Sequence, residues 1–101
     1  MQSTNQSNLP NNNILKMELK NLVIQTLKIP DVKPEEISDD ENLFEGRLGI
    51  DSVDALELVM ALQRNYKVHI DDQNLGRFII KSINTIADFI VKEQEKMKNQ
   101  A

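Results

Sequence analysis

The segment GIDSVDALELVMAL, residues 49–62, carries a helical hydrophobic pattern that begins at an Asp-Ser pair. When its residues are placed about 100° apart, as in an α-helix, the apolar side chains fall on two separate faces. The larger face consists of Ala55, Leu58, Val59, Leu62 and Tyr66, and the smaller face of Val53, Leu56 and Met60. A helix in a small bundle needs only one apolar face for the core. The segment therefore predicts a core helix whose second apolar face has another role.

Two explanations of the second apolar face are open. The segment 39–50 could cover it as a loop, or the face could stay exposed as a binding surface rimmed by acidic residues. Met60 favours binding, because methionine suits surfaces that accommodate several partners.

Acidic residues are concentrated around this segment. The window 39–57 holds seven acidic residues and one basic residue, Arg47, and so carries −6 in a chain whose net charge is −4. The acids are Asp39, Asp40, Glu41, Glu45, Asp51, Asp54 and Glu57. Such a run is typical of a solvated helix face, or of a docking patch for basic partners.

Ser52 could be a helix cap, a nucleophile or an attachment point. A serine or aspartate at this place caps a helix by default. A hydrolytic nucleophile needs a nearby base, but the only histidine, His69, follows the far end of the helix, and no G-x-S-x-G segment is present. We therefore reject catalysis. A phosphodiester on Ser52 is favoured by the unpaired N–H groups and the positive dipole end of a helix N-terminus.

Length and composition bound the class of protein. The chain has 101 residues, 40% of them hydrophobic and 28% charged, which suits one globular domain. The absence of cysteine excludes disulfides, thiol nucleophiles and thiolate metal sites. The negative net charge argues against nucleic acid or an anionic membrane surface as a partner. Neither a membrane-spanning stretch nor a secretory signal is visible, so we expect a cytoplasmic protein. We also expect the protein to be a monomer.

The order of the predicted elements gives an all-α fold, a small four-helix bundle with three main helices, one short helix and a long first loop. Residues 1–13 are rich in Asn, Gln and Ser and predict a disordered tail, followed by one domain over 14–98. The predicted elements are a helix at 14–28, a helical turn from Pro34, a helix at 52–66, a short helix at 72–78 and a last helix capped by Ser82.

Apolar spacing predicts which side chains pack inward. The predicted anchors of the long loop are Leu43, Phe44, Leu48 and Ile50, with tight turns at Gly46 and Gly49. The first helix is expected to use Ile14, Met17, Leu19, Val23 or Leu22, and Leu27, and the last helix Ile83, Ile86, Ala87, Ile90 and Val91.

The segment LGIDSVDALELVMALQRNYKVHI, residues 48–70, resembles the acyl carrier proteins. Gly49, Asp51, Ser52 and Val53 occupy the positions of the family signature. The upstream PEEISDDENLFEG resembles the family's long first loop, and the downstream INTIADFI resembles its last helix. The resemblance extends over roughly residues 14–95. It rests on the motif together with the order of the predicted helices.

The resemblance implies a non-catalytic carrier whose Ser52 receives 4′-phosphopantetheine from coenzyme A by a Mg²⁺-dependent phosphopantetheinyl transferase. The thiol of this arm would hold acyl groups as thioesters. The acyl chain would lie against Leu58, Leu62 and Ile79. Partners would be the transferase, ketosynthases and other acyl-processing enzymes with basic docking patches. The docking residues carried over by position are Asp51, Val53, Asp54, Leu56, Glu57 and Met60.

Some positions depart from the family pattern. Val53 replaces the commoner Leu, and Gln63 and Arg64 stand where housekeeping carriers usually have acids. The resemblance therefore leaves open general fatty-acid synthesis and a specialised bacterial fatty-acid or polyketide-type pathway. An aminoacyl or D-alanyl carrier, and an unmodified acidic helical adaptor, are the alternative interpretations.

Overall fold

The computed structural model describes residues 12–46 and 48–99, and within them the regular structure is entirely helical. The elements are α1 (Asn12–Leu27), the 3₁₀ helix η2 (Pro34–Glu36), α2 (Ser52–Tyr66), α3 (Gln73–Ile79) and α4 (Ile83–Asn99). The predicted all-α bundle with three main helices and one short helix is thus confirmed. None of these helices has the length and apolar character needed to cross a membrane.

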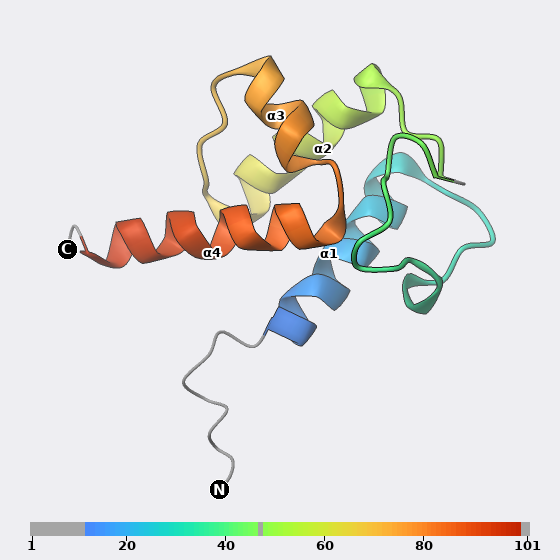
Figure 1. Ribbon diagram of the computed structural model, residues 1–101, viewed down its shortest axis with the longest axis horizontal. Helices are drawn as coiled ribbons and strands as arrows, with labels where there is room; N and C mark the ends of the chain where they lie inside the picture. The colour runs from blue at the N-terminus through green and yellow to red at the C-terminus, as the bar shows by residue number, and fades with distance from the viewer. Residues whose placement is uncertain (1–11, 47, 100–101) are drawn as a thin grey trace, which may run out of the picture.

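The helices surround one hydrophobic core (Figure 1). The first helix, α1, packs against both α2 and α4, while α3 bridges α2 and α4. The fully buried side chains come from every main helix and from the long loop, so no element folds around a core of its own. The largest of them are Leu19, Val23, Ile37, Leu43, Leu58, Leu62, Ile80, Ile83, Ile86 and Ile90.

Helix α1 begins at Asn12, two residues before its predicted start, and the rest of the predicted tail lies outside the described residues. Its inward face was predicted only in part. Leu19 and Val23 are buried, but Ile14 is 58% exposed and Met17 is 39% exposed. Counted at about 100° per residue, Ile14 and Met17 lie roughly opposite Leu19, so the predicted series mixed two faces of the helix.

Helix α4 follows its prediction closely. The Ser82 hydroxyl accepts a hydrogen bond from the Thr85 N–H at 3.2 Å, and the Thr85 hydroxyl accepts from the Ser82 N–H at 3.0 Å. This reciprocal cap fixes the helix start, as expected for a serine at this position. Ile83, Ile86, Ala87 and Ile90 are buried, and Val91 is half-buried.

The long loop between α1 and α2 is fastened to the connection between α3 and α4 and to the first turn of α4. The Leu43 N–H donates to the Lys81 carbonyl at 2.8 Å, and the Asn84 N–H donates to the Asp39 carbonyl at 2.9 Å. Of the predicted anchors, Leu43 and Ile50 are fully buried, while Phe44 and Leu48 pack partly buried against the core. The loop is therefore an ordered part of the fold.

Asp39 ties the same loop to α1. Its carboxylate lies 2.7 Å from the Lys20 Nζ and 3.8 Å from the Lys16 Nζ. The hydrogen bond from Lys20, together with the charges of both lysines, outweighs the effect of burial and lowers the pKa of Asp39. Asp39 thus belongs to the structural framework, although it is one of the seven acids of the sequence window.

Gly49 sets the approach of the loop to α2. Its φ of +54° lies in the left-handed region, where glycine has no steric penalty. The next residue, Ile50, is buried, and its N–H donates to the Leu43 carbonyl at 3.1 Å. This turn delivers the chain to Asp51 and the start of α2.

Tyr66, at the end of α2, provides a test of the packing between α1 and α2. Its hydroxyl donates to the Glu18 Oε1 at 3.1 Å. Burial, followed by this hydrogen bond and the charge of Glu18, raises the pKa of Tyr66 from 10.0 to about 12. Because the raised pKa belongs to the folded state, its contribution to stability is complete below pH 10.0 and is lost as the pH rises through about 12.

We expect titration of tyrosinate absorbance to give a midpoint near 12 for the folded protein. Tyr66 is the only tyrosine and the chain has no tryptophan, so the signal comes from this one group. Glu18→Gln should lower the midpoint only part of the way to 10.0, because burial, the larger cause, remains. Glu57→Gln is the matched control and should leave the midpoint unchanged. A wild-type midpoint equal to that of the unfolded chain would contradict the packing.

Candidate functional site

The start of α2 assigns different tasks to Asp51 and Ser52. Asp51 is the N-cap, and its carboxylate accepts from the Asp54 N–H at 2.9 Å. The Asp54 carboxylate accepts in return from the Asp51 N–H at 3.3 Å, which completes a capping box. Ser52 is the first residue of the helix, so the capping that a serine here performs by default belongs to its neighbour.

The Ser52 side chain is exposed, and its hydroxyl forms no hydrogen bond within residues 12–46 and 48–99. One of the N–H groups expected to favour a phosphate at this helix end, that of Asp54, is already bound by Asp51. The hydroxyl is therefore available for chemistry, while the amide groups around it are only partly available.

The two apolar faces of α2 have opposite environments. Leu58 and Leu62 are buried in the core together with Ala55, as predicted, and Ala61 joins them. Val59 and Tyr66 are partly buried. The second face is not covered by the long loop, because its members are all exposed. The exposed fractions are 67% for Val53, 48% for Leu56 and 50% for Met60.

The acids around this exposed face share the same helix end. Asp51 and Glu57 are exposed, and Asp54 is half-buried by its role in the cap. We use the name docking surface for the six residues that the sequence singles out around Ser52. They are Asp51, Val53, Asp54, Leu56, Glu57 and Met60.

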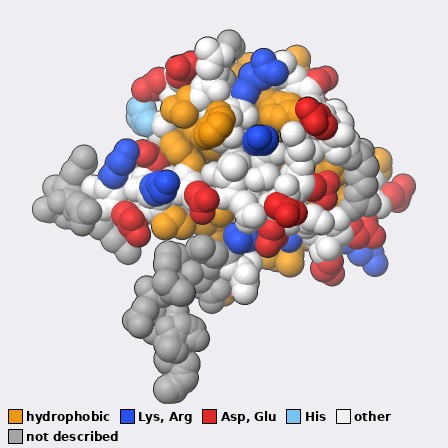
Figure 2. Space-filling view, in the orientation of Figure 1, with side chains coloured by type: hydrophobic (Ala, Val, Ile, Leu, Met, Phe, Trp, Pro, Cys, Tyr) orange, Lys and Arg blue, Asp and Glu red, His pale blue; other side chains and the backbone are white. Residues whose placement is uncertain are grey.

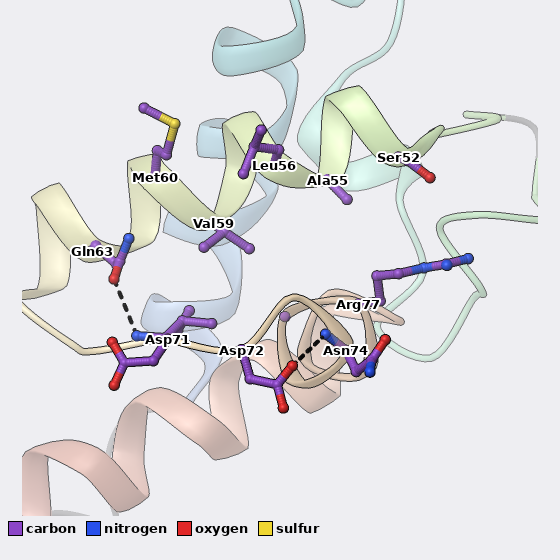
Figure 3. Close-up of a pocket in the computed structure, with 12 residues that line it drawn as sticks. Ser52, Ala55, Leu56, Val59, Met60, Gln63, Asp71, Asp72, Asn74 and Arg77 are labelled. Carbon is purple, nitrogen blue, oxygen red and sulfur yellow. Dashed lines mark hydrogen bonds between the residues drawn. The ribbon is translucent and has the colours of Figure 1, made fainter.

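A groove of about 300 Å³ runs between α2 and the segment 70–77, and Ser52 lies at one end of it (Figure 3). The wall formed by α2 is mostly apolar, and the opposite wall is mostly polar. The α2 wall consists of Ser52, Ala55, Leu56, Val59, Met60 and Gln63. The opposite wall consists of Ile70, Asp71, Asp72, Asn74, Gly76 and Arg77.

Two residues determine how close the two walls of the groove come to each other. A Cβ added to Gly76 would lie 3.1 Å from the Val59 Cγ2, so the glycine permits a close approach of α3 to α2. The Gln63 side-chain oxygen accepts from the Ile70 N–H at 3.1 Å (Figure 3). Gln63, which departs from the family pattern, is therefore part of the framework of the groove.

The predicted contacts of the acyl chain stay a prediction. Leu58, Leu62 and Ile79 are 1%, 1% and 3% exposed, and none of them lines the groove. They fill the core beneath it, because the inward face of α2 packs directly on the neighbouring helices. Asn74, Gly76 and Arg77 were missed. A glycine inside a short helix was the one available signal, since it costs helix stability and often marks close packing.

The histidine lies away from Ser52. Helix α2 is unbroken from Ser52 to Tyr66, a length of roughly 20 Å at the usual rise per residue. His69, the only histidine of the chain, follows the far end of this helix and is exposed. The arrangement gives Ser52 no histidine base.

Comparisons with known proteins agree on one family. A family model described as a phosphopantetheine attachment site matches residues 18–90. An acyl carrier protein of Buchnera aphidicola subsp. Acyrthosiphon pisum (strain Tuc7) is 32% identical over 78 residues, covering 77% of this chain and 90% of the relative. Acyl carrier proteins of Wolinella succinogenes and Campylobacter fetus subsp. fetus are 33% and 34% identical over 73 residues, 72% of this chain and 84% and 87% of the relatives.

The matched residues include the Asp-Ser pair, α2 and the groove, and they cover most of the chain. The resemblance drawn from the sequence is thereby confirmed. This chain belongs to the acyl carrier proteins, which are carriers rather than catalysts and bear a phosphopantetheine attachment site.

Proposed function

We propose that the chain carries acyl groups as thioesters on a 4′-phosphopantetheine arm attached to the Ser52 Oγ. The observation that carries the proposal is the free Ser52 hydroxyl at the end of a groove. It is exposed, it has no hydrogen bond within the described residues, and its neighbour Asp51 performs the capping.

The residues around Ser52 fit such an arm. Esterification of the Ser52 Oγ would break no hydrogen bond of the described structure, and the capping box of Asp51 and Asp54 would remain. The adjoining groove offers an apolar wall from α2 over its length. The arm supplies the thiol that forms the thioester, and the chain itself contains no cysteine that could compete with it.

The docking surface provides a basis for recognition by other enzymes. Its exposed apolar side chains, Val53, Leu56 and Met60, can be covered by a partner without unfolding the core. Its acids, Asp51 and Glu57 above all, favour partners with basic patches. We assign this surface to the phosphopantetheinyl transferase, to ketosynthases and to other acyl-processing enzymes.

The relatives are named acyl carrier proteins, which supports acyl groups as the cargo, and we assign the chain to fatty-acid biosynthesis in general or specialised metabolism. Gln63 is neutral and accepts a hydrogen bond from the Ile70 N–H, so α2 has one acid fewer here and gains a link to the opposite wall of the groove. Arg64 is exposed in the last turn of α2 and remains a departure from housekeeping carriers. The monomeric state and the cytoplasmic location stay predictions.

Attachment at Ser52 is tested by intact mass. Incubation with a phosphopantetheinyl transferase, Mg²⁺ and coenzyme A should add one phosphopantetheinyl group to the wild type and none to Ser52→Ala. Since Asp51 caps the helix, Ser52→Ala should keep the wild-type circular dichroism. Ser82→Ala, which removes a different serine hydroxyl, should still be modified. An equal mass gain on Ser52→Ala would show attachment elsewhere.

The acids of the docking surface are tested by charge reversal. Glu57→Lys should slow modification roughly tenfold at low ionic strength, because exposed charges mainly affect association. The effect should shrink at high salt, since the screening length falls from about 30 Å at 0.01 M to about 3 Å at 1 M salt. Glu95→Lys makes the same charge change on an exposed site of α4 and should have little effect. Equal rates for wild type and Glu57→Lys at low salt would remove the acidic surface from the proposal.

The apolar part of the docking surface is tested by Leu56→Asn. We expect slower modification at both low and high salt, because loss of apolar contact is not screened. Stability should fall by roughly 1 kcal/mol, because Leu56 is 48% exposed and only its buried half is lost from the fold. Leu58→Asn, two residues along the chain on the buried face of α2, should instead unfold the protein, as denaturant titration would show. A Leu56→Asn variant with unchanged kinetics would exclude this side chain from docking.

A further inference from the structure

Arg77 stands on the wall of the groove that faces α2. Of the described residues that line the groove, it is the one cation, and the neighbouring acids on the same wall are Asp71 and Asp72. Figure 3 shows its side chain extending from α3 toward the end of α2 that carries Ser52. The guanidinium and the Ser52 hydroxyl thus belong to the same end of one groove.

The guanidinium is oriented by an aromatic ring. Its Cζ lies 5.9 Å from the centroid of the Phe44 ring, within the range of a cation–π contact. Phe44 is itself held in the long loop, where its N–H donates to the Asn42 Oδ1 at 2.9 Å. No carboxylate of the described residues forms an ion pair with Arg77. Its N–H donors are therefore oriented by packing and remain free for an anion.

The surroundings of Ser52 need such a cation once a phosphate is attached. Asp51 and Asp54 place two carboxylates at the start of α2, on either side of Ser52 in the sequence. One helix N–H group that could have bound a phosphate is already taken by the Asp51 carboxylate. A phosphodiester on Ser52 would add a negative charge beside these acids, which is unfavourable unless an opposite charge is near.

We propose that Arg77 is a positioning residue that holds the phosphodiester of the arm on Ser52. The inference rests on the proposed attachment at Ser52. A guanidinium suits this task better than an ammonium group, because its planar set of donors matches two phosphate oxygens at once. By binding the phosphate from α3, Arg77 directs the start of the arm along the groove.

Solution NMR tests this contact, after intact mass has shown whether the arm is present. On conversion of the unmodified to the modified wild type, the Nε–H signal of Arg77 should shift and that of Arg64 should not. The ³¹P signal of the arm should shift in Arg77→Gln and stay in place in Arg64→Gln. Arg64→Gln is the matched control, because Arg64 is exposed on α2 and does not line the groove.

The possible outcomes separate the two proposals. If the wild type gains no mass, attachment at Ser52 is wrong and the role of Arg77 is wrong with it. If the mass is gained but neither the Arg77 signal nor the ³¹P signal of Arg77→Gln moves, only the role of Arg77 is overturned. Should Arg77→Gln fail to fold, the Nε–H signal of the wild type still decides the question by itself.

Discussion

A backbone hydrogen bond of 2.8 Å, from the Leu43 N–H to the Lys81 carbonyl, fixes the long loop against the connection between α3 and α4. The Leu43 carbonyl in turn accepts from the Ile50 N–H. The backbone of this one buried residue therefore links the connection between α3 and α4 to the segment that leads into α2. This attachment holds in place the loop segment that carries Phe44 beside Arg77 and that leads into the start of α2. A loop without it would leave Ser52 on a helix end of variable position.

Helix α2 serves the core and the surface with different side chains. Burial of a leucine side chain such as Leu58 stabilises the fold by about 1.5–3 kcal/mol. Leu56 and Met60 contribute roughly half as much, because about half of each remains in water. Their exposure costs the isolated protein solubility rather than stability, and the acids around them offset that cost. Stability and recognition can therefore change separately on one helix.

The sequence predicted the order of the helices well because local signals mark their ends. Ser82 caps α4, and Pro30 follows the end of α1. The predictions from the sequence failed where the outcome depends on tertiary packing. The inward face of α1 was mistaken because Ile14 and Met17 are as apolar as the residues that are buried. The polar wall of the groove was missed because Gly76 indicates a close approach of α3 without indicating its partner, and the partner, Val59, is set by tertiary packing.

The capping of α2 by Asp51 has a consequence for the working cycle of a carrier. Ligation or modification changes folding stability only through interactions that differ between the folded and unfolded states. Because the cap does not use the Ser52 oxygen, loading of Ser52 does not require any hydrogen bond of the cap to break. Under the proposed function, the empty, modified and acylated forms would share one helix start, and the protein would pass among them without refolding at each step.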